Sequence, residues 1–454
     1  MDNNMANNNV NEDIQNIDLP RLYGNSLEPS KTEKIAVLFS FPIAFLYTYI
    51  ILPSYYDGTY KNGSWYAIIA IFTVLFCISV ELYYKNSLCN LNRKLKTSPE
   101  PLKIESFIWL GCISVILASM FLGRNQVWGD GLALFFIHGY AVHWLILQSG
   151  RLMEDGSGPF TPLDILNGFF VFPLKHFFLR IKVIWSIITS KINKKGKENE
   201  RTSTWIAVAI GLILFYAAGN LLASADETFN RLLGDLLNYL SFDIYSEFPL
   251  RFIVSLPVGA YLYGLIVGTN REDTTKLKNK KEYILLKLDD LKKVPAKVWI
   301  IMLAGFCILY LVFFFIQGSY IFGAFTRTLP EGFTVAQYAR QGFFELCKIM
   351  GLNFILLWIV IKSSNVDIRH NSLAMIMCSV ILAESILFSI TAFSKLMLYI
   401  SCFGFTPLRI QSAWLIFVLF CGSVLTIYSL WTRKKSFKIW IFISGISLAL
   451  THLF

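Results

Sequence analysis

The sequence has few charged residues, which occupy 16% of its 454 positions, whereas hydrophobic residues occupy 55%. A soluble domain of this size needs a more polar surface, and the mean hydropathy of +0.53 excludes that class. The eight cysteines show no Cys-x-x-Cys spacing and no pairing pattern, and seven lie in or beside apolar runs. We interpret them as small hydrophobic side chains rather than as disulfides or metal ligands.

The chain also lacks the short motifs of soluble enzymes. It contains no GxxxxGK[ST], no GxGxxG opening a helix after a strand, no HExxH and no GxSxG, so nucleotide-driven, zinc-peptidase and serine-hydrolase functions lose their usual signature. His138 and His143 are five residues apart, which places their rings on different faces of a helix. We therefore predict no metal site and no cofactor.

Eleven apolar stretches are long enough to cross a bilayer as helices. They cover residues 35–52, 65–82, 106–122, 132–148, 204–222, 250–268, 298–318, 342–361, 372–392, 411–431 and 437–453. The predicted fold class is all-α, a polytopic transmembrane helix bundle with about 11 spans (10–12) and additional interfacial amphipathic helices. We divide the chain into a disordered cytoplasmic leader (1–34), an N-terminal four-span unit (35–150), cytoplasmic interfacial helices with a basic loop (151–203) and a C-terminal seven-span unit (204–454).

Basic residues set the predicted orientation, because cytoplasmic loops collect Lys and Arg. With the N-terminus inside, the inner segments hold 32 of the 41 basic residues and the outer segments hold 8. The odd number of spans then places the C-terminus outside. The same loops account for the net charge of +11. We therefore predict that these basic loops face the anionic lipids of the bilayer, and that the protein does not bind nucleic acid.

Two cytoplasmic stretches are predicted to be helical without spanning. Residues 163–188 alternate aromatic and basic side chains, which favours helices lying in the membrane interface; a re-entrant hairpin or an extra span is the alternative. Residues 277–291 repeat leucine and isoleucine at helical spacing between lysines. This second helix caps the bundle or faces lipid, or it docks a cytoplasmic or membrane partner protein.

Charged residues inside the spans mark the candidate site. A charge near the bilayer centre costs roughly 2.5 to 3.5 kcal/mol on insertion scales, so such residues need a reason. The candidate polar intramembrane site consists of Arg340, Glu345, Lys348, Glu384 and Lys395. We predict that Lys348 and Glu384 pair in the outer half of the bilayer, because their depths agree when the ninth span ends near Ala392.

Outward carboxylates support a separate enzyme hypothesis. Asp57 and Asp130 lie in the first two outer loops, where membrane-embedded transferases place acids that hold a cation or act as a base. Solvated loop acids are the alternative interpretation. The enzyme assignment therefore stays open.

Four motifs lie between residue 204 and the C-terminus: Ala225-Asp226 with Phe229 and Arg231-Leu232-Leu233, 329–334 (LPEGFT), 338–346 (YARQGFFEL), and Tyr399 with 404–409 (GFTPLR). In these motifs the chain resembles a bacterial multi-pass membrane family catalogued only as a domain of unknown function. It indicates an outer-side motif of Asp226, Arg231 and Arg409. The family often has acids where this chain has Ile400 and Ser401, which argues against a catalytic acid there. The resemblance implies a bacterial plasma membrane location and brings no established activity.

Three function classes follow from these patterns. The first is a transporter or ligand-binding membrane protein with an outward-facing polar cavity. The second is a scaffold or sensor subunit of an envelope signalling or resistance system. The third is a membrane-embedded transferase that uses outer-loop carboxylates. No motif identifies the substrate.

Overall fold

The computed structural model describes residues 29–52, 63–92, 101–123, 127–193, 247–326 and 343–454. Nearly all of these residues are helical, and the β-structure among them is one backbone bridge between Val294 and Ser364. Several predictions fall outside the described residues: most of the leader, the span at 204–222, Asp57, Asp226, Arg231 and Arg340.

Contacts divide the chain into two compact units that interleave in sequence. Unit 1 comprises Met1–Thr97 and Asn167–Asp273, and unit 2 comprises Ser98–Leu166 and Thr274–Phe454. This grouping follows spatial contacts, whereas the predicted division into four- and seven-span units follows the order of spans and stays a prediction.

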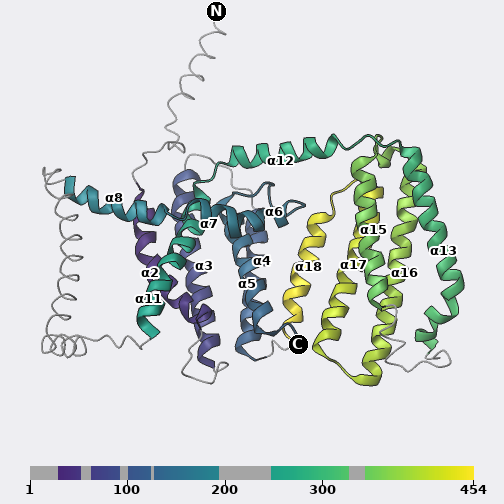
Figure 1. The fold of residues 1–454 in the computed structure, drawn as a ribbon, viewed down its shortest axis with the longest axis horizontal. Helices are drawn as coiled ribbons and strands as arrows, with labels where there is room; N and C mark the ends of the chain where they lie inside the picture. The colour runs from purple at the N-terminus through teal and green to yellow at the C-terminus, as the bar shows by residue number, and fades with distance from the viewer. Residues whose placement is uncertain (1–28, 53–62, 93–100, 124–126, 194–246, 327–342) are drawn as a thin grey trace, which may run out of the picture. The chain divides into compact units, whose positions relative to one another are not determined.

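The described part of unit 1 is built on three long helices with shorter segments beside them (Figure 1). Its elements are α2 (Lys31–Ile51), α3 (Gly63–Asn92), η1 (Asn167–Val171), α7 (Phe172–Lys175), α8 (Leu179–Asn193), α11 (Glu247–Tyr263) and η2 (Gly264–Gly268). Ser30 begins α2 with a capping box, in which its hydroxyl accepts from the Glu33 amide and the Glu33 carboxylate accepts from the Ser30 amide. Pro42 and Pro257 lie inside α2 and α11, as the sequence indicates.

Unit 2 contains the remaining long helices. Its elements are α4 (Pro101–Phe121), α5 (Gly129–Ser149), α6 (Thr161–Leu166), α12 (Thr274–Asp289), α13 (Ala296–Thr326), α15 (Phe343–Ser363), η3 (Ile368–His370), α16 (Ser372–Phe403), α17 (Pro407–Thr432) and α18 (Phe437–Thr451). Short connections join α15 to α16, α16 to α17 and α17 to α18, so these helices run antiparallel to their neighbours (Figure 1).

Nine helices in the described ranges are long and apolar enough to cross a membrane, and α18 is a shorter apolar helix. Together they correspond to ten of the eleven predicted spans, and the other, 204–222, lies outside the described residues. The fold class is therefore confirmed. Three helices run well past the predicted ends of their spans: α3 continues to Asn92 rather than 82, α13 to Thr326 rather than 318, and α16 to Phe403 rather than Ala392.

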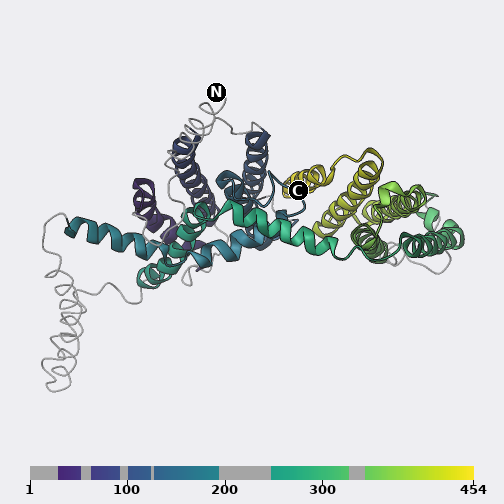
Figure 2. The ribbon, with the colours of Figure 1, turned by 90° about the horizontal axis from the view of Figure 1, so that it is seen from above.

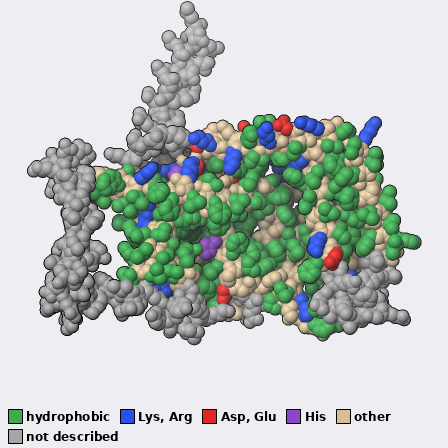
Figure 3. Space-filling model, in the orientation of Figure 1, with side chains coloured by type: hydrophobic (Ala, Val, Ile, Leu, Met, Phe, Trp, Pro, Cys, Tyr) green, Lys and Arg blue, Asp and Glu red, His purple; other side chains and the backbone are tan. Residues whose placement is uncertain are grey.

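Two basic helices lie across the long helices of their own units. Figures 1 and 2 show α8 crossing the helices of unit 1 and α12 crossing those of unit 2. The region predicted as interfacial, 163–188, forms α6, η1, α7 and α8, none of which is a candidate span by length and composition. Its position in the membrane interface stays a prediction. In Figure 3, hydrophobic side chains cover most of the visible face of the long helices.

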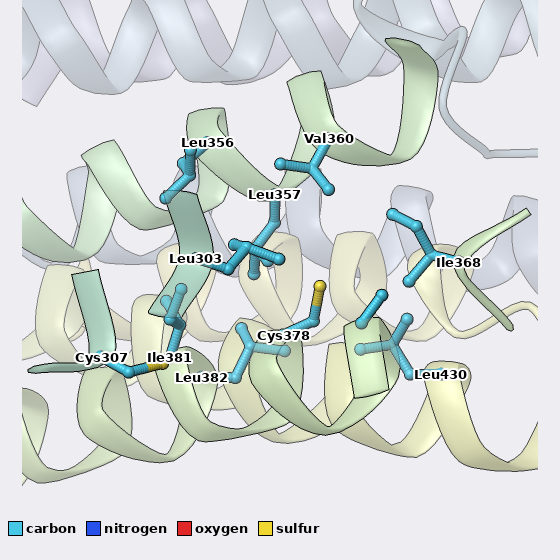
Figure 4. Close-up of a cluster of buried hydrophobic side chains, with 11 residues drawn as sticks. Leu303, Cys307, Leu356, Leu357, Val360, Ile368, Cys378, Ile381, Leu382 and Leu430 are labelled. Atoms are coloured by element: carbon cyan, nitrogen blue, oxygen red, sulfur yellow. The ribbon is translucent and has the colours of Figure 1, made fainter. Parts of the chain in front are cut away.

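Among its described residues, unit 2 contains two separate hydrophobic clusters. One joins α13, α15, α16 and α17 through residues that include Leu303, Leu357, Leu382 and Leu430 (Figure 4). The other lies further along the same helices and includes Met350 and Phe388. Because Met350 precedes Leu357 on α15 while Phe388 follows Leu382 on α16, the antiparallel pair leaves a layer between the clusters. That layer contains the polar site.

Candidate intramembrane polar site

A chain of hydrogen bonds links three spanning helices of unit 2. The Tyr310 hydroxyl on α13 donates to Asn353 Oδ1 on α15 over 2.7 Å, and Asn353 Nδ2 donates to Ser385 Oγ on α16 over 2.8 Å. Ser385 Oγ in turn donates to the Ile381 carbonyl. Asn353 and Ser385 are fully buried, so the bonds satisfy polar groups that would otherwise be costly among apolar helices.

Glu384 lies beside this chain without joining it. Its side chain is only 3% exposed, and neither carboxylate oxygen has a hydrogen-bond partner among the described residues. Cys307 and Tyr310 on α13 are close enough to interact electrostatically with it. A buried carboxylate with neither donor nor cation costs several kcal/mol, so this group is stable only when it holds a proton or a cation.

The predicted pair of Lys348 and Glu384 is wrong. Lys348 is exposed, whereas Glu384 is buried and unpartnered in the described part of the chain. The hydrogen bond between Asn353 and Ser385 fixes the register of α15 against α16, and Lys348 lies five residues, about 7.5 Å, from Asn353 toward the start of α15. The error follows from the extra length of α16, which places Glu384 deeper than the prediction assumed.

The other predicted site residues divide into three groups. Glu345 is exposed on the first turn of α15, and Lys395 is buried on α16, where its charge interacts with that of Glu345. Arg340, Asp226 and Arg231 lie outside the described residues. The structure thus places Glu345, Lys348 and Lys395 on the half of the helix pair between Glu384 and the end formed by Phe403.

Arg409 of the outer-side motif stabilises a turn. α16 ends at Phe403, Gly404 adopts φ +75°, and α17 begins at Pro407. The Arg409 guanidinium lies 4.1 Å from the centre of the Tyr399 ring and donates to the Gly404 carbonyl. This part of the motif therefore forms the turn that connects α16 to α17, with glycine at a backbone conformation that other residues avoid.

A second polar cluster lies at the end of unit 2 opposite the turn between α16 and α17. Glu105 on α4 accepts from the Ser157 amide over 2.6 Å, and its other oxygen lies 2.7 Å from Lys438 Nζ. His143 Nε2 and Ser157 Oγ are 2.8 Å apart. Gly156 has φ +119°, and a Cβ there would lie 2.8 Å from Lys438 Nζ. The cluster holds the loop after α5 against α4 and α18. His138 contacts the Leu134 carbonyl instead, so the two histidines have separate partners.

Unit 1 uses most of its buried charges to join helices. Arg251 donates to the Thr48 and Leu52 carbonyls, at the negative end of the α2 dipole. Arg271 forms two bonds of 2.9 Å to the Glu33 carboxylate. Glu272 accepts from Lys175 and lies 2.8 Å from His176 Nε2. Burial alone would raise the pKa of Glu272, but these hydrogen bonds lower it below the ordinary value.

Arg180 is the exception in unit 1. It is 3% exposed, donates to the Leu256 carbonyl over 3.2 Å and stacks 3.9 Å from the centre of the Phe41 ring. Its Nε and Nη2 atoms have no hydrogen-bond partner in the described ranges. Burial lowers the pKa of Arg180 from its ordinary value, yet a guanidinium stays charged in proteins. Ring stacking and one carbonyl thus hold this cation between α8, α2 and α11.

The sequence patterns did not single out the neutral polar residues beside Glu384. Asn353 is an amide inside an apolar run, and the rule that selected Glu384 would also have selected it. Tyr310 and Ser385 are common in such runs and give no comparable signal.

The helices and their buried polar groups define a multi-pass membrane protein. The chain belongs to the family described as a domain of unknown function, DUF4153, which matches residues 110–453. This confirms the resemblance and extends it toward the N-terminus from the predicted start at residue 204. No curated protein and no solved structure matches the chain.

Proposed function

We propose that this chain is a transport or ligand-binding protein of the membrane in which Glu384 takes up a proton or a small cation. The observation that carries the proposal is a carboxylate that is buried within a spanning helix and has no partner in the described structure. A group kept only for packing would be apolar, since an isolated acid weakens the fold. The presence of this acid therefore favours a function in which the Glu384 carboxylate is free to bind a proton or a cation.

The surroundings of Glu384 support this role. Asn353, Ser385 and Tyr310 supply oxygen atoms in the same layer, and carbonyl and hydroxyl oxygens are ligands of hard cations. Their mutual hydrogen bonds give the layer a fixed geometry, whereas the carboxylate remains available. A proton or cation arriving there would neutralise the charge without breaking an existing ion pair.

A series of polar residues supports access from the end of α16 at Phe403. Lys395 lies eleven residues beyond Glu384, about 16 Å along the helix, and Glu345 and Lys348 lie on the neighbouring α15. Charged side chains are rare within spans and usually face the bundle interior or water. These residues are consistent with an outward-facing polar cavity, in which Arg340 would also take part.

We infer the orientation from the charge distribution. The predicted inner segments, which include the basic helices α8 and α12, hold most of the Lys and Arg residues of the sequence, and the positive-inside rule assigns such segments to the cytoplasm. The N-terminus is then cytoplasmic and the C-terminus outside, in a bacterial plasma membrane. In a cysteine-less background, Asn279→Cys in α12 should resist an impermeant thiol reagent in intact cells, and labelling there would reverse the orientation.

Carbodiimide labelling tests the central proposal. Dicyclohexylcarbodiimide reacts with protonated carboxyl groups in apolar surroundings, so the wild-type chain in lipid nanodiscs should carry one adduct on the peptide containing Glu384. Glu384→Gln should lose the adduct, and Glu345→Gln, which removes an exposed acid of the neighbouring helix, should keep it.

Transport is measured separately in proteoliposomes that contain a pH-sensitive dye. Proton movement driven by an imposed potassium-diffusion potential should fall at least about tenfold in Glu384→Gln and stay unchanged in Glu282→Gln, which removes an exposed acid of α12 outside the proposed cavity. Unlabelled Glu384 together with equal flux in both variants would overturn the proposal.

Partner binding is a second candidate function, supported by α12. Tyr283 and Leu286 are 61% and 64% exposed on this helix beside several lysines. A basic helix with exposed apolar side chains suits a docking surface for a cytoplasmic partner. Chemical cross-linking through Asn279→Cys in whole cells would test it, because a discrete cross-linked protein is expected for a partner and is not expected for a helix lying on lipid.

A further inference from the structure

An apolar groove of about 380 Å³ runs along unit 1 between α2, α3 and the η2 end of α11. Small side chains create the hollow: Ala36 and Ser40 are one turn apart on α2, and Ser79 lines the α3 wall. The Ser40 hydroxyl donates to the Val37 carbonyl and the Ser79 hydroxyl to the Leu75 carbonyl. The interior therefore offers almost no free polar group and suits a hydrocarbon chain.

The extent of the groove matches one membrane leaflet. Its lining on α2 runs from Thr32 near the helix start to Ile43, eleven residues or about 16 Å along the axis. The hydrocarbon core of a bilayer is about 30 Å thick, so the groove covers about half of it. It lies on helices long and apolar enough to span, with Ile35 and Ile78 about half exposed at its edges. A single acyl chain from that leaflet is the occupant that fits this length and polarity.

Positive charge surrounds the end of the groove at Thr32. Lys31 is exposed and Lys34 is half-buried, and both flank Thr32 at the positive end of the α2 dipole. The intervening Glu33 does not cancel them, because Arg271 neutralises it through two hydrogen bonds. Glu81 is exposed on α3 near the same end but does not line the groove. A phosphate at the headgroup level would meet two lysines and a helix N-terminus.

We propose that unit 1 binds one anionic phospholipid, with an acyl chain in this groove and the phosphate beside Lys31 and Lys34. The site is separate from Glu384, and nothing in its chemistry depends on transport. It predicts preferential binding of a phospholipid with net negative charge over a zwitterionic one, because both share the chain but differ in net charge.

Native mass spectrometry of the full-length protein in mild detergent tests the acyl-chain site in the groove. With dioleoyl phosphatidylglycerol as the probe, Ile78→Trp fills the groove and should weaken binding of the first lipid at least about tenfold. Ile71→Trp is the matched control, since Ile71 has similar exposure on the same helix, 52% against 47%, but does not line the groove. On the α2 wall, Ile35→Trp should act like Ile78→Trp, and Leu38→Trp should not.

The headgroup site is tested with the same probe and dioleoyl phosphatidylcholine. Wild type should prefer the phosphatidylglycerol about tenfold, and the double variant Lys31→Gln, Lys34→Gln should bind both lipids alike. The acyl-chain assignment would be overturned if Ile78→Trp and Ile35→Trp bound the lipid as tightly as wild type. It would also be overturned if the controls Ile71→Trp and Leu38→Trp lost as much lipid binding as these two variants. A preference that survives in the lysine variant, or none in wild type, would overturn the headgroup assignment. Thermal unfolding of each variant verifies that it is folded. If Ile78→Trp does not fold, lipid binding by Ile35→Trp decides the test of the groove.

Discussion

Unit 1 and the part of unit 2 formed by α13, α15 and α16 treat buried charge in opposite ways. In unit 1, Arg251 and Arg271 reach carbonyl or carboxylate oxygens of α2, so each charge joins two helices. In unit 2, the hydrogen bonds that join α13, α15 and α16 come from neutral groups, and Glu384 takes no part in them. Charge therefore joins the helices of unit 1, whereas neutral groups join α13, α15 and α16 of unit 2, where Glu384 forms no hydrogen bond among the described residues.

This difference separates structural acids from candidate functional ones. Glu33 and Glu384 have similarly low exposure, 7% and 3%, so burial alone does not distinguish them. Their partners do: Glu33 has a bidentate arginine, and Glu384 has none among the described residues. Removing the two carboxylates should therefore change stability in opposite directions.

The largest expected effect is in unit 1. Glu33→Ala leaves the Arg271 guanidinium without its partner and removes the capping box of α2, so unfolding free energy should fall by about 3 to 5 kcal/mol. Arg271→Met should also destabilise, and the double variant should lose less than the sum of the two. Denaturant unfolding in detergent micelles measures all three. Strictly additive losses would mean that the pair does not couple and that unit 1 is not held by charge.

The next effect is a pH dependence at the edge of unit 2. Burial raises the pKa of Asp164, on α6 outside the spans, to about 7, although a hydrogen bond from the Met153 amide opposes the shift. Below pH 4 both folded and unfolded states hold the proton. Between about pH 4 and 7 only the unfolded state releases it, so stability declines by roughly 4 kcal/mol and then levels off.

Asp164→Asn tests that dependence, because it removes the titrating group and keeps the size of the side chain. Unfolding free energy of this variant, measured across the same pH range, should lose the decline seen in wild type. Asp155→Asn changes an exposed acid of the same region and should retain it. Identical pH profiles for wild type and Asp164→Asn would contradict the assignment.

A smaller effect of opposite sign is expected at the polar site. Glu384→Met removes a buried acid that has no hydrogen bond to lose, so unit 2 should gain about 1 to 3 kcal/mol while proton movement fails. Asn353→Leu is the contrast, because it leaves the Tyr310 and Ser385 hydroxyls without their amide partner and should destabilise by a similar amount. Thermal unfolding in one detergent compares the two. A loss of stability in Glu384→Met would show that the acid has a structural partner.

The sequence predicts the spans well and the site only in part, for a physical reason. Apolar runs are local, so every candidate span among the described residues was predicted. The end of α16 was missed because Ser394 and Lys395 interrupt the apolar run, although packing buries both side chains. Glu384 stands out within its run. Its surroundings do not, because the bond from Tyr310 to Asn353 crosses 43 residues and depends on the register of separate helices.

The smallest effect concerns the family motif at the end of α16. Arg409→Lys keeps the charge but loses the planar guanidinium that stacks on Tyr399 and bonds the Gly404 carbonyl. Because the turn is exposed, the expected loss is about 0.5 to 1 kcal/mol. Tyr399→Leu should cost a similar amount, and the double variant should cost little more than either single one, because they share one contact. Thermal unfolding measures the three variants, and labelling of Glu384 by dicyclohexylcarbodiimide should be unchanged in Arg409→Lys. Altered labelling would mean that this turn controls access to the buried acid, and the division of unit 2 into a structural end and a separate polar layer would then fail.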